Sequence, residues 1–198
     1  METKDKIVVF ASANKHKIQE VKNIMSGYTV ISMSEVGFSG DIVEDGKTFE
    51  ENALIKARAI TKFLNDKGQN NYLVLSDDTG LCVDALGGEP GVYSARFAGD
   101  HNDQKNRDKI ISLLFGKNDR SANFTCVVVL MDKNFDYIVG EGKTFGYMLD
   151  KEYGDTSFGY DAIFYSNDLK KSFGEATSDE KNSVSHRARA IKNLLSKC

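Results

Sequence analysis

The sequence has no tryptophan, a single proline and three cysteines, Cys82, Cys126 and Cys198, without metal-binding spacing. This odd, unpatterned set argues against both a disulfide framework and a zinc site. No apolar run approaches the roughly 18 residues of a membrane helix. The opening residues METKDKIVVF also lack the apolar core of a signal peptide. A net charge of -3 leaves no basic surplus for coating nucleic acid. We therefore expect a cytoplasmic protein without a membrane span or a nucleic-acid partner.

The chain length and the hydrophobic pattern favour one α/β domain. A chain of 198 residues suffices for one sizeable core and is short for two. The apolar periodicity predicts strands at 7–11, 28–33, 72–76, 81–86, 123–131, 137–149 and 163–165, and helices at 15–25, 48–65, 102–115 and 185–196. Strands and helices alternate early and strands cluster later. We expect a single domain over residues 1–198 with a mixed sheet.

The stretch VLSDDTGL contains two adjacent carboxylates where we expect an apolar strand to end. Asp77 and Asp78 follow Ser76, and like charges at the end of a buried strand need a positive partner. Glu44, in VEDGKTF, is a third carboxylate without histidine or cysteine company. Such oxygen ligands favour Mg²⁺, or else Mn²⁺, over zinc. One of these carboxylates would act as general base towards water, and an ordinary turn or capping pair is the alternative interpretation.

Three basic residues fall inside apolar stripes when the predicted helices are drawn as wheels. Lys17, Lys56 and Arg187 each lie between apolar neighbours on their helix. A cation that faces a core is costly unless it is paired, although a long side chain can also extend from a helix end to solvent. Three such cations beside a carboxylate pair favour an internal site for a polyanion.

The turn ASANKHK leads from the first predicted strand directly into a helix. Asn14 is a suitable N-cap, and the first N–H groups of a helix attract anions. Ser12, Asn14 and Lys17 would then surround a phosphate. The turn is not a P-loop, because the G-x-x-x-x-G-K-[ST] pattern is absent.

Two further segments, SFGYDAIF and DEKNSVSHRARA, combine aromatic and polar side chains. Phe158 and Tyr160 offer ring faces on which a base can stack, next to Asp161. The alternative is an aromatic turn that packs on the core. The second segment places Lys181, Ser185, His186 and Arg187 near a helix start, where their donors would read a carbonyl-bearing base; an ordinary charged helix entrance is the alternative.

Five motifs give the chain a resemblance to a known family. SANKHK, EDGKTFEENALIKA, SDDTGLCVDALGGEPGVYSARFAG, FGYDAIF and DEKNSVSHRARA together resemble the inosine triphosphate pyrophosphatase family, in its order and spacing, over about residues 7–195. The resemblance implies two lobes around a long central mixed sheet, with the active site in the cleft between them. It also implies a homodimer that needs Mg²⁺ and cleaves ITP, dITP and XTP to the monophosphate and pyrophosphate.

The same resemblance implies a role for each matched residue. Asp78 would be the general base and would hold Mg²⁺ with Glu44, while Asp77 would support that site. Lys56 would assist catalysis and phosphate binding. The remaining residues would bind substrate, and they are Ser12, Asn14, Lys17, Thr79, Phe158, Gly159, Tyr160, Asp161, Lys181, His186 and Arg187.

The chain departs from the family pattern at three positions. Ser157 stands where the family usually has glycine, Ala162 where it has proline, and Thr79 where it often has serine. The first two changes affect the implied base pocket and leave the metal site alone. A phosphatase that releases inorganic phosphate and a non-catalytic nucleotide sensor remain alternative functions.

Overall fold

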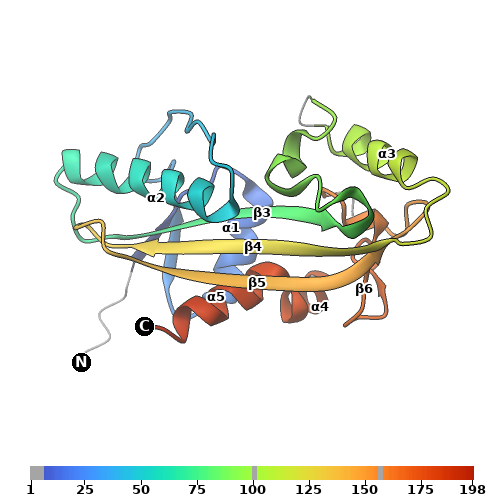
Figure 1. Ribbon diagram of the computed structural model, residues 1–198. Coiled ribbons are helices and arrows are strands. Elements are labelled where there is room, and N and C mark those ends of the chain that lie inside the picture. The colour runs from blue at the N-terminus through green and yellow to red at the C-terminus, as the bar shows by residue number, and fades with distance from the viewer. Residues whose placement is uncertain (1–6, 100–101, 156–157) are drawn as a thin grey trace. The chain divides into compact units, whose positions relative to one another are not determined.

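The computed structural model describes residues 7–99, 102–155 and 158–198 (Figure 1). The strands are β1 (Ile7–Phe10), β2 (Thr29–Ser32), β3 (Leu73–Val83), β4 (Ser121–Met131), β5 (Tyr137–Met148), β6 (Phe164–Ser166) and β7 (Lys171–Ser172). The α-helices are α1 (Lys15–Ile24), α2 (Phe49–Asp66), α3 (Asp103–Leu113), α4 (Ser178–Val184) and α5 (His186–Leu195). Short 3-10 helices cover Asp84–Leu86, Gly91–Arg96 and Asp161–Ile163.

All seven strands belong to one sheet, in the order β2-β1-β3-β4-β5-β6-β7. β1 pairs in parallel with β2 and with β3, whereas β6 pairs antiparallel with β5 and with β7. The sheet is therefore mixed, which confirms the predicted α/β class. Among the described residues, no helix has the length and apolar character that a bilayer crossing requires.

The chain forms two compact units. Unit 1 contains residues up to Asp78 together with Cys126–Gly142 and Arg187–Cys198, and unit 2 contains Thr79–Thr125 and Lys143–His186. β3, β4 and β5 each contribute residues to both units.

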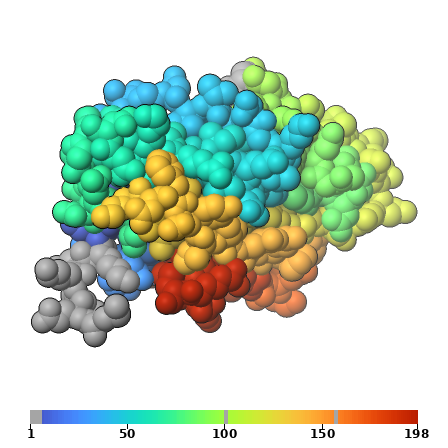
Figure 2. Space-filling model, turned by 60° about the vertical axis from the view of Figure 1, so that its left-hand side comes forward, coloured from blue at the N-terminus to red at the C-terminus, as the bar shows by residue number. Residues whose placement is uncertain are grey.

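In unit 1 the strands lie between two helical layers. Val21 of α1 and Ile191 of α5 share one apolar cluster with Phe10 and Leu75. On the other face, Ile60 of α2 belongs to a second cluster with neighbouring strand residues. Figure 1 accordingly shows α2 and α5 on opposite sides of the strands. The outer surface of α2 lies beside the turn between β4 and β5 (Figure 2), where Asn65 Nδ2 donates to the backbone oxygen of Lys133 at 2.8 Å.

Unit 2 has its own core, which is rich in aromatic rings. Phe124 packs against Phe164 with ring centroids 4.7 Å apart and against Phe173 at 6.1 Å. Leu81 of β3 and Ile110 of α3 belong to the same cluster. This core holds α3 and the segment around Phe164 in one unit.

The predicted break after Ser76 is wrong, because β3 continues without interruption from Leu73 to Val83. Asp77 and Asp78 therefore lie within a strand, not after it. The predicted strand at 81–86 is also wrong at its end, since Asp84–Leu86 is a 3-10 helix. Charged residues are rare inside strands, and here cations on the helices of unit 1 compensate them. α4 and β7 were not predicted at all.

Candidate functional site

The continuity of β3 places Asp77 and Asp78 on opposite faces of the sheet. Successive side chains of a strand point to opposite sides. Asp77 shares its face with Leu75, which packs on the α1 and α5 side, whereas Asp78 shares its face with Val74, which packs on the α2 side. The two carboxylates therefore have different partners, although they are neighbours in sequence.

Asp77 lies between two of the cations that the helix wheels identified. Lys17 Nζ is 3.1 Å from Asp77 Oδ2, and Arg187 Nη2 donates to the same oxygen at 3.0 Å. Arg187 also pairs with Glu20 of α1. Burial opposes ionisation of Asp77, but the positive charges of Lys17, Arg187 and Lys56 outweigh it and hold the pKa of Asp77 well below its usual range. Asp77 is thus a fixed anion.

Asp78 and Glu44 converge on one ammonium group. Lys56 of α2 places Nζ 2.5 Å from Glu44 Oε2 and 3.8 Å from Asp78 Oδ1. Burial lowers the pKa of Lys56, and the carboxylates of Asp77, Asp78 and Glu44 more than reverse this, so its pKa is raised. Glu44 and Asp78, which both approach Lys56, are the two carboxylates that the family resemblance implies as Mg²⁺ ligands.

The pKa of Asp78 is shifted in the opposite direction from that of Asp77. Its burial outweighs the attraction of Lys56 and the hydrogen bond from Asn52, so the pKa of Asp78 is raised. A carboxylate with a raised pKa is a better proton acceptor than one held ionised by two cations. Asp78 is therefore better suited than Asp77 to act as a general base.

Asn52 is a residue that the sequence analysis missed. Its side chain is buried, donates from Nδ2 to Asp78 Oδ2 at 3.0 Å, and accepts from the backbone N–H of Gly46 at 2.9 Å. A Cβ atom at Gly46 would lie 2.7 Å from Asn52 Oδ1, so this approach requires glycine. Asn52 thereby connects Asp78 to the loop that carries Glu44. Its position one helical turn before Lys56 was the signal available in the sequence.

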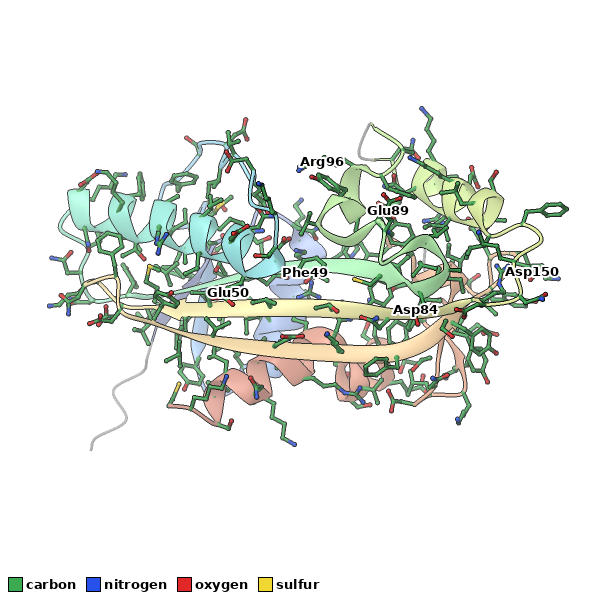
Figure 3. The ribbon with its side chains drawn as sticks, in the orientation of Figure 1. Phe49, Glu50, Asp84, Glu89, Arg96 and Asp150 are labelled. Atoms are coloured by element: carbon green, nitrogen blue, oxygen red, sulfur yellow. The ribbon has the colours of Figure 1, made fainter. Side chains whose placement is uncertain are left out.

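The first turn of α2 supplies this part of the site. Figure 3 labels Phe49 and Glu50, which mark where the helix begins. The predicted capping box is confirmed, because Thr48 accepts from the N–H of Glu51 and the Glu51 side chain accepts from the N–H of Thr48. This cap fixes the start of the helix that bears Asn52 and Lys56.

The turn before α1 has the predicted cap at Asn14. Asn14 Oδ1 accepts from the N–H groups of His16 and Lys17 at 3.0 and 3.2 Å, and Ser12 Oγ accepts from the N–H of Asn14 at 3.2 Å. Ser12 and Asn14 thus organise the helix start that carries Lys17. Their contact with a phosphate stays a prediction. Glu20, one turn after Lys17, is a second residue that the sequence analysis missed.

In unit 2 the predicted base-binding residues include a buried ion pair beside aromatic rings. Lys181 Nζ is 2.6 Å from Asp161 Oδ2, and both residues are buried. The same Nζ lies 5.3 Å from the ring centroid of Phe158 and 5.7 Å from that of Phe173. The arrangement therefore combines a ring face with a charged hydrogen-bonding pair.

The other predicted base-binding residues of unit 2 have structural contacts. Tyr160 is buried in the core, and its hydroxyl donates to the backbone oxygen of Ser94 at 2.7 Å. His186 stacks on Phe124 with ring centroids 4.9 Å apart. Thr79 is half-buried, and Ala162 is buried. Ser157, the other departure in that motif, lies outside the described residues.

Comparisons with known proteins extend over nearly the whole chain. The sequence model of the Ham1 family matches residues 8–197. A dITP/XTP pyrophosphatase of Clostridium perfringens is 47% identical over 191 residues, covering 94% of each chain. A protein of the same name from Bacillus subtilis is 44% identical over 194 residues, covering 96% of this chain and 95% of that one.

Two solved structures show the same fold. The Ham1 protein of Staphylococcus aureus has a TM-score of 0.84 and 40% sequence identity, covering 97% of each chain. The Ham1 protein of Coxiella burnetii also has a TM-score of 0.84, with 34% identity over 98% of this chain and 100% of that one.

Proposed function

Because this chain belongs to the Ham1 family, we propose that it hydrolyses non-standard purine nucleoside triphosphates, ITP, dITP and XTP, to the monophosphate and pyrophosphate. The names of its relatives supply the substrate class. The observation that carries the chemistry is the convergence of Glu44 and Asp78 on Lys56. The expected biological result is removal of non-standard purines from the nucleotide pool.

The donor set fits a Mg²⁺ ion. Glu44 and Asp78 contribute carboxylate oxygens only, and Mg²⁺ in nucleotide enzymes is usually held by one or two carboxylates with water and substrate phosphates. The described residues contain no group of three or more histidine, cysteine or acidic side chains that could hold a metal ion. Bound by Glu44 and Asp78, Mg²⁺ would neutralise phosphate charge, and Mn²⁺ has the same oxygen preference. Asp77 would support this site by fixing the cations around it.

The protein side chains would divide the reaction between binding and proton transfer. Lys17 and Lys56 would stabilise the negative charge of the triphosphate. Asp78 would accept a proton from the attacking water. The water oxygen forms a bond to the α-phosphorus while the bond from that phosphorus to the leaving pyrophosphate breaks. This sequence requires no covalent intermediate with the protein.

The unit 2 residues would supply base selectivity. Phe158 offers a ring face for stacking, and Lys181 offers a donor for an oxygen at the purine 6-position. An amino group at that position would leave a buried donor without a partner, which penalises ATP. His186 and Arg187 also belong to the expected recognition set. Arg187 is already bonded to Asp77, so its contribution to the base would be indirect.

The deciding experiment measures products. The purified protein is incubated with ITP, XTP, dITP, GTP and ATP, with Mg²⁺ or with EDTA, and the products are separated by chromatography. We expect monophosphate and pyrophosphate from ITP, dITP and XTP, a preference over ATP on the order of 10²-fold or more, and no turnover in EDTA. Inorganic phosphate as product would indicate a phosphatase instead, and nucleotide binding without turnover would indicate a sensor.

We further propose, from the family resemblance alone, that the protein is a cytoplasmic homodimer. Light scattering after size-exclusion chromatography tests the oligomeric state, and a mass near twice 22.0 kDa is expected. A monomer at micromolar concentration would refute the dimer without affecting the proposed reaction.

A further inference from the structure

Helix α3 holds the backbone of Gly159 from both sides. Asp103 Oδ2 accepts from the N–H of Gly159 at 2.8 Å, and Arg107 Nη1 donates to its carbonyl oxygen, also at 2.8 Å. Asp103 and Arg107 lie one turn apart on α3, so they share a face of that helix. Both contacts are to backbone atoms of Gly159. They therefore fix the path of the main chain there and do not depend on which side chains flank it.

Arg107 is built into unit 2 as a rigid donor. It is 2% exposed, and Glu152 Oε1 accepts from its Nε at 2.8 Å. Its Nη2 donates to Gln104 Oε1 at 2.8 Å, and Gln104 in turn donates to Glu152 at 2.7 Å. The hydrogen bond from Arg107 is the largest cause of a lowered pKa at Glu152. Because the guanidinium is planar and is held at Nε and Nη2, its Nη1, which bonds to Gly159, has little freedom to move.

The segment that α3 holds carries two of the expected base-binding groups. Gly159 has φ +57°, a left-handed conformation that glycine adopts without strain. The N–H of Asp161 donates to the backbone oxygen of Phe158 at 3.2 Å, so residues 158–161 form a tight turn around Gly159. Lys181 contacts both ends of this turn, with Nζ near the Phe158 ring and bonded to Asp161. A displacement of Gly159 would therefore move the ring and the ion pair together.

We propose that Asp103 and Arg107 are positioning residues for base selectivity, which fix the turn at Gly159 and so set where Phe158 and the Asp161–Lys181 pair meet the purine. The proposal rests on the function proposed above for the role of Phe158 and Asp161, but its geometry lies wholly within unit 2. Neither α3 residue needs to touch the nucleotide. Their effect is on which base is accepted, and the residues of unit 1 that act on phosphate are unaffected.

The test compares substrate selectivity in variants of these two residues. Asp103→Ala removes the acceptor for the Gly159 N–H, whereas Asp103→Asn retains a side-chain oxygen that can accept. Arg107→Met removes the donor but retains an apolar chain of similar length, and Arg107→Lys retains the charge. Lys109→Met is the matched control, because Lys109 also donates from α3 to a backbone oxygen, that of Phe97 at 2.6 Å.

We expect selectivity to fall in the two variants that delete a contact. Asp103→Ala and Arg107→Met should raise the KM for ITP about tenfold with little change in kcat, since a lost hydrogen bond to a charged group corresponds to about that factor. The ratio of kcat/KM for ITP to that for ATP should fall by a similar factor. Asp103→Asn should recover most of this ratio, and Lys109→Met should keep it. Thermal unfolding of each variant checks that the protein is folded.

A selectivity ratio that stays unchanged in folded Asp103→Ala and Arg107→Met would overturn the proposal, as would an equal loss of activity on both nucleotides. Calorimetric dissociation constants for ITP and ATP in EDTA give the same comparison without turnover. If the unsubstituted protein binds but does not hydrolyse, the proposed function fails, and these dissociation constants still decide the role of α3. A preference for ITP that disappears in the variants would then support it.

Discussion

Units 1 and 2 both bury charged side chains, but these side chains have different neighbours in the two units. In unit 1, Asp77 pairs with Lys17 and Arg187 on one side of the sheet. Asp78 approaches Lys56 on the other side. In unit 2 the buried ion pair of Lys181 with Asp161 lies beside the rings of Phe158 and Phe173.

The difference suits the two kinds of contact proposed above, to phosphate and to a base. A site with several cations and carboxylates suits phosphate and a hard metal ion, which are themselves highly charged. A ring face with one hydrogen-bonding pair suits a flat, uncharged base. Variants of unit 1 should therefore change stability and turnover, whereas variants of the unit 2 turn should change affinity and selectivity.

The largest expected effect is on stability, at Asp77. Asp77→Ala leaves Lys17 and Arg187 without their shared buried partner. Removing one member of a buried charge set costs about 3–5 kcal/mol in the free energy of unfolding. Urea denaturation measures this loss. Asp66→Ala is the control on the same unit, because Asp66 forms an exposed ion pair with Lys62, and such surface pairs contribute little to stability. A loss below about 1 kcal/mol at Asp77 would show that this network contributes little to the fold.

The next effect is on turnover, at Asp78. Asp78→Asn replaces the proton acceptor with an amide of the same shape. We expect kcat for ITP to fall by about 10²-fold or more, the scale of lost general-base catalysis, with nucleotide binding retained. Steady-state kinetics and calorimetry separate the two quantities. Near-normal kcat would remove Asp78 from the mechanism.

A smaller effect on turnover is expected at Asn52. Asn52→Ala removes the hydrogen bond to Asp78 and frees the N–H of Gly46. A hydrogen bond to a charged group contributes about 1.5–3 kcal/mol, so kcat should fall about tenfold or more. Asn65→Ala is the matched control on α2, because the Asn65 side chain bonds instead to the backbone of Lys133. Equal kinetics for the two variants would refute the positioning role of Asn52.

The smallest effect is on affinity, at Phe158. Phe158→Ala removes the proposed stacking surface, which contributes about 1–3 kcal/mol for a base on an aromatic ring. The KM for ITP should rise about tenfold, and kcat should change little. Phe115→Ala is the control, because the Phe115 side chain is 91% exposed in the same unit. A fall in kcat at constant KM would place Phe158 in the chemical step instead.

Helical periodicity located the inward-facing cations of unit 1, which form ion pairs in the structure, while their binding of a polyanion stays a prediction. Lys56 and Arg187 interrupt apolar stripes, and both are buried in the structure. Lys17 interrupts a third stripe and pairs with Asp77. A polar residue within the apolar stripe of a helix requires a hydrogen-bonding or ionic partner. A helical wheel identifies such a residue from the local sequence alone.

The parts that were not predicted depend on contacts between distant segments. Two adjacent aspartates resemble a strand end, but cations of α1, α2 and α5 compensate their charge where β3 continues through them. Arg107 meets Gly159 across 52 positions of sequence. Nothing in the local pattern of α3 distinguishes a buried arginine that holds a backbone turn from an exposed one.

The position of water attack tests the proposed mechanism most directly. Hydrolysis of ITP is carried out in ¹⁸O-labelled water, and mass spectrometry determines which product contains the label. Attack at the α-phosphorus, with Asp78 accepting the proton, predicts the label in the monophosphate and none in the pyrophosphate. Label in the pyrophosphate, or in released inorganic phosphate, would show attack at another phosphorus and would refute attack at the α-phosphorus.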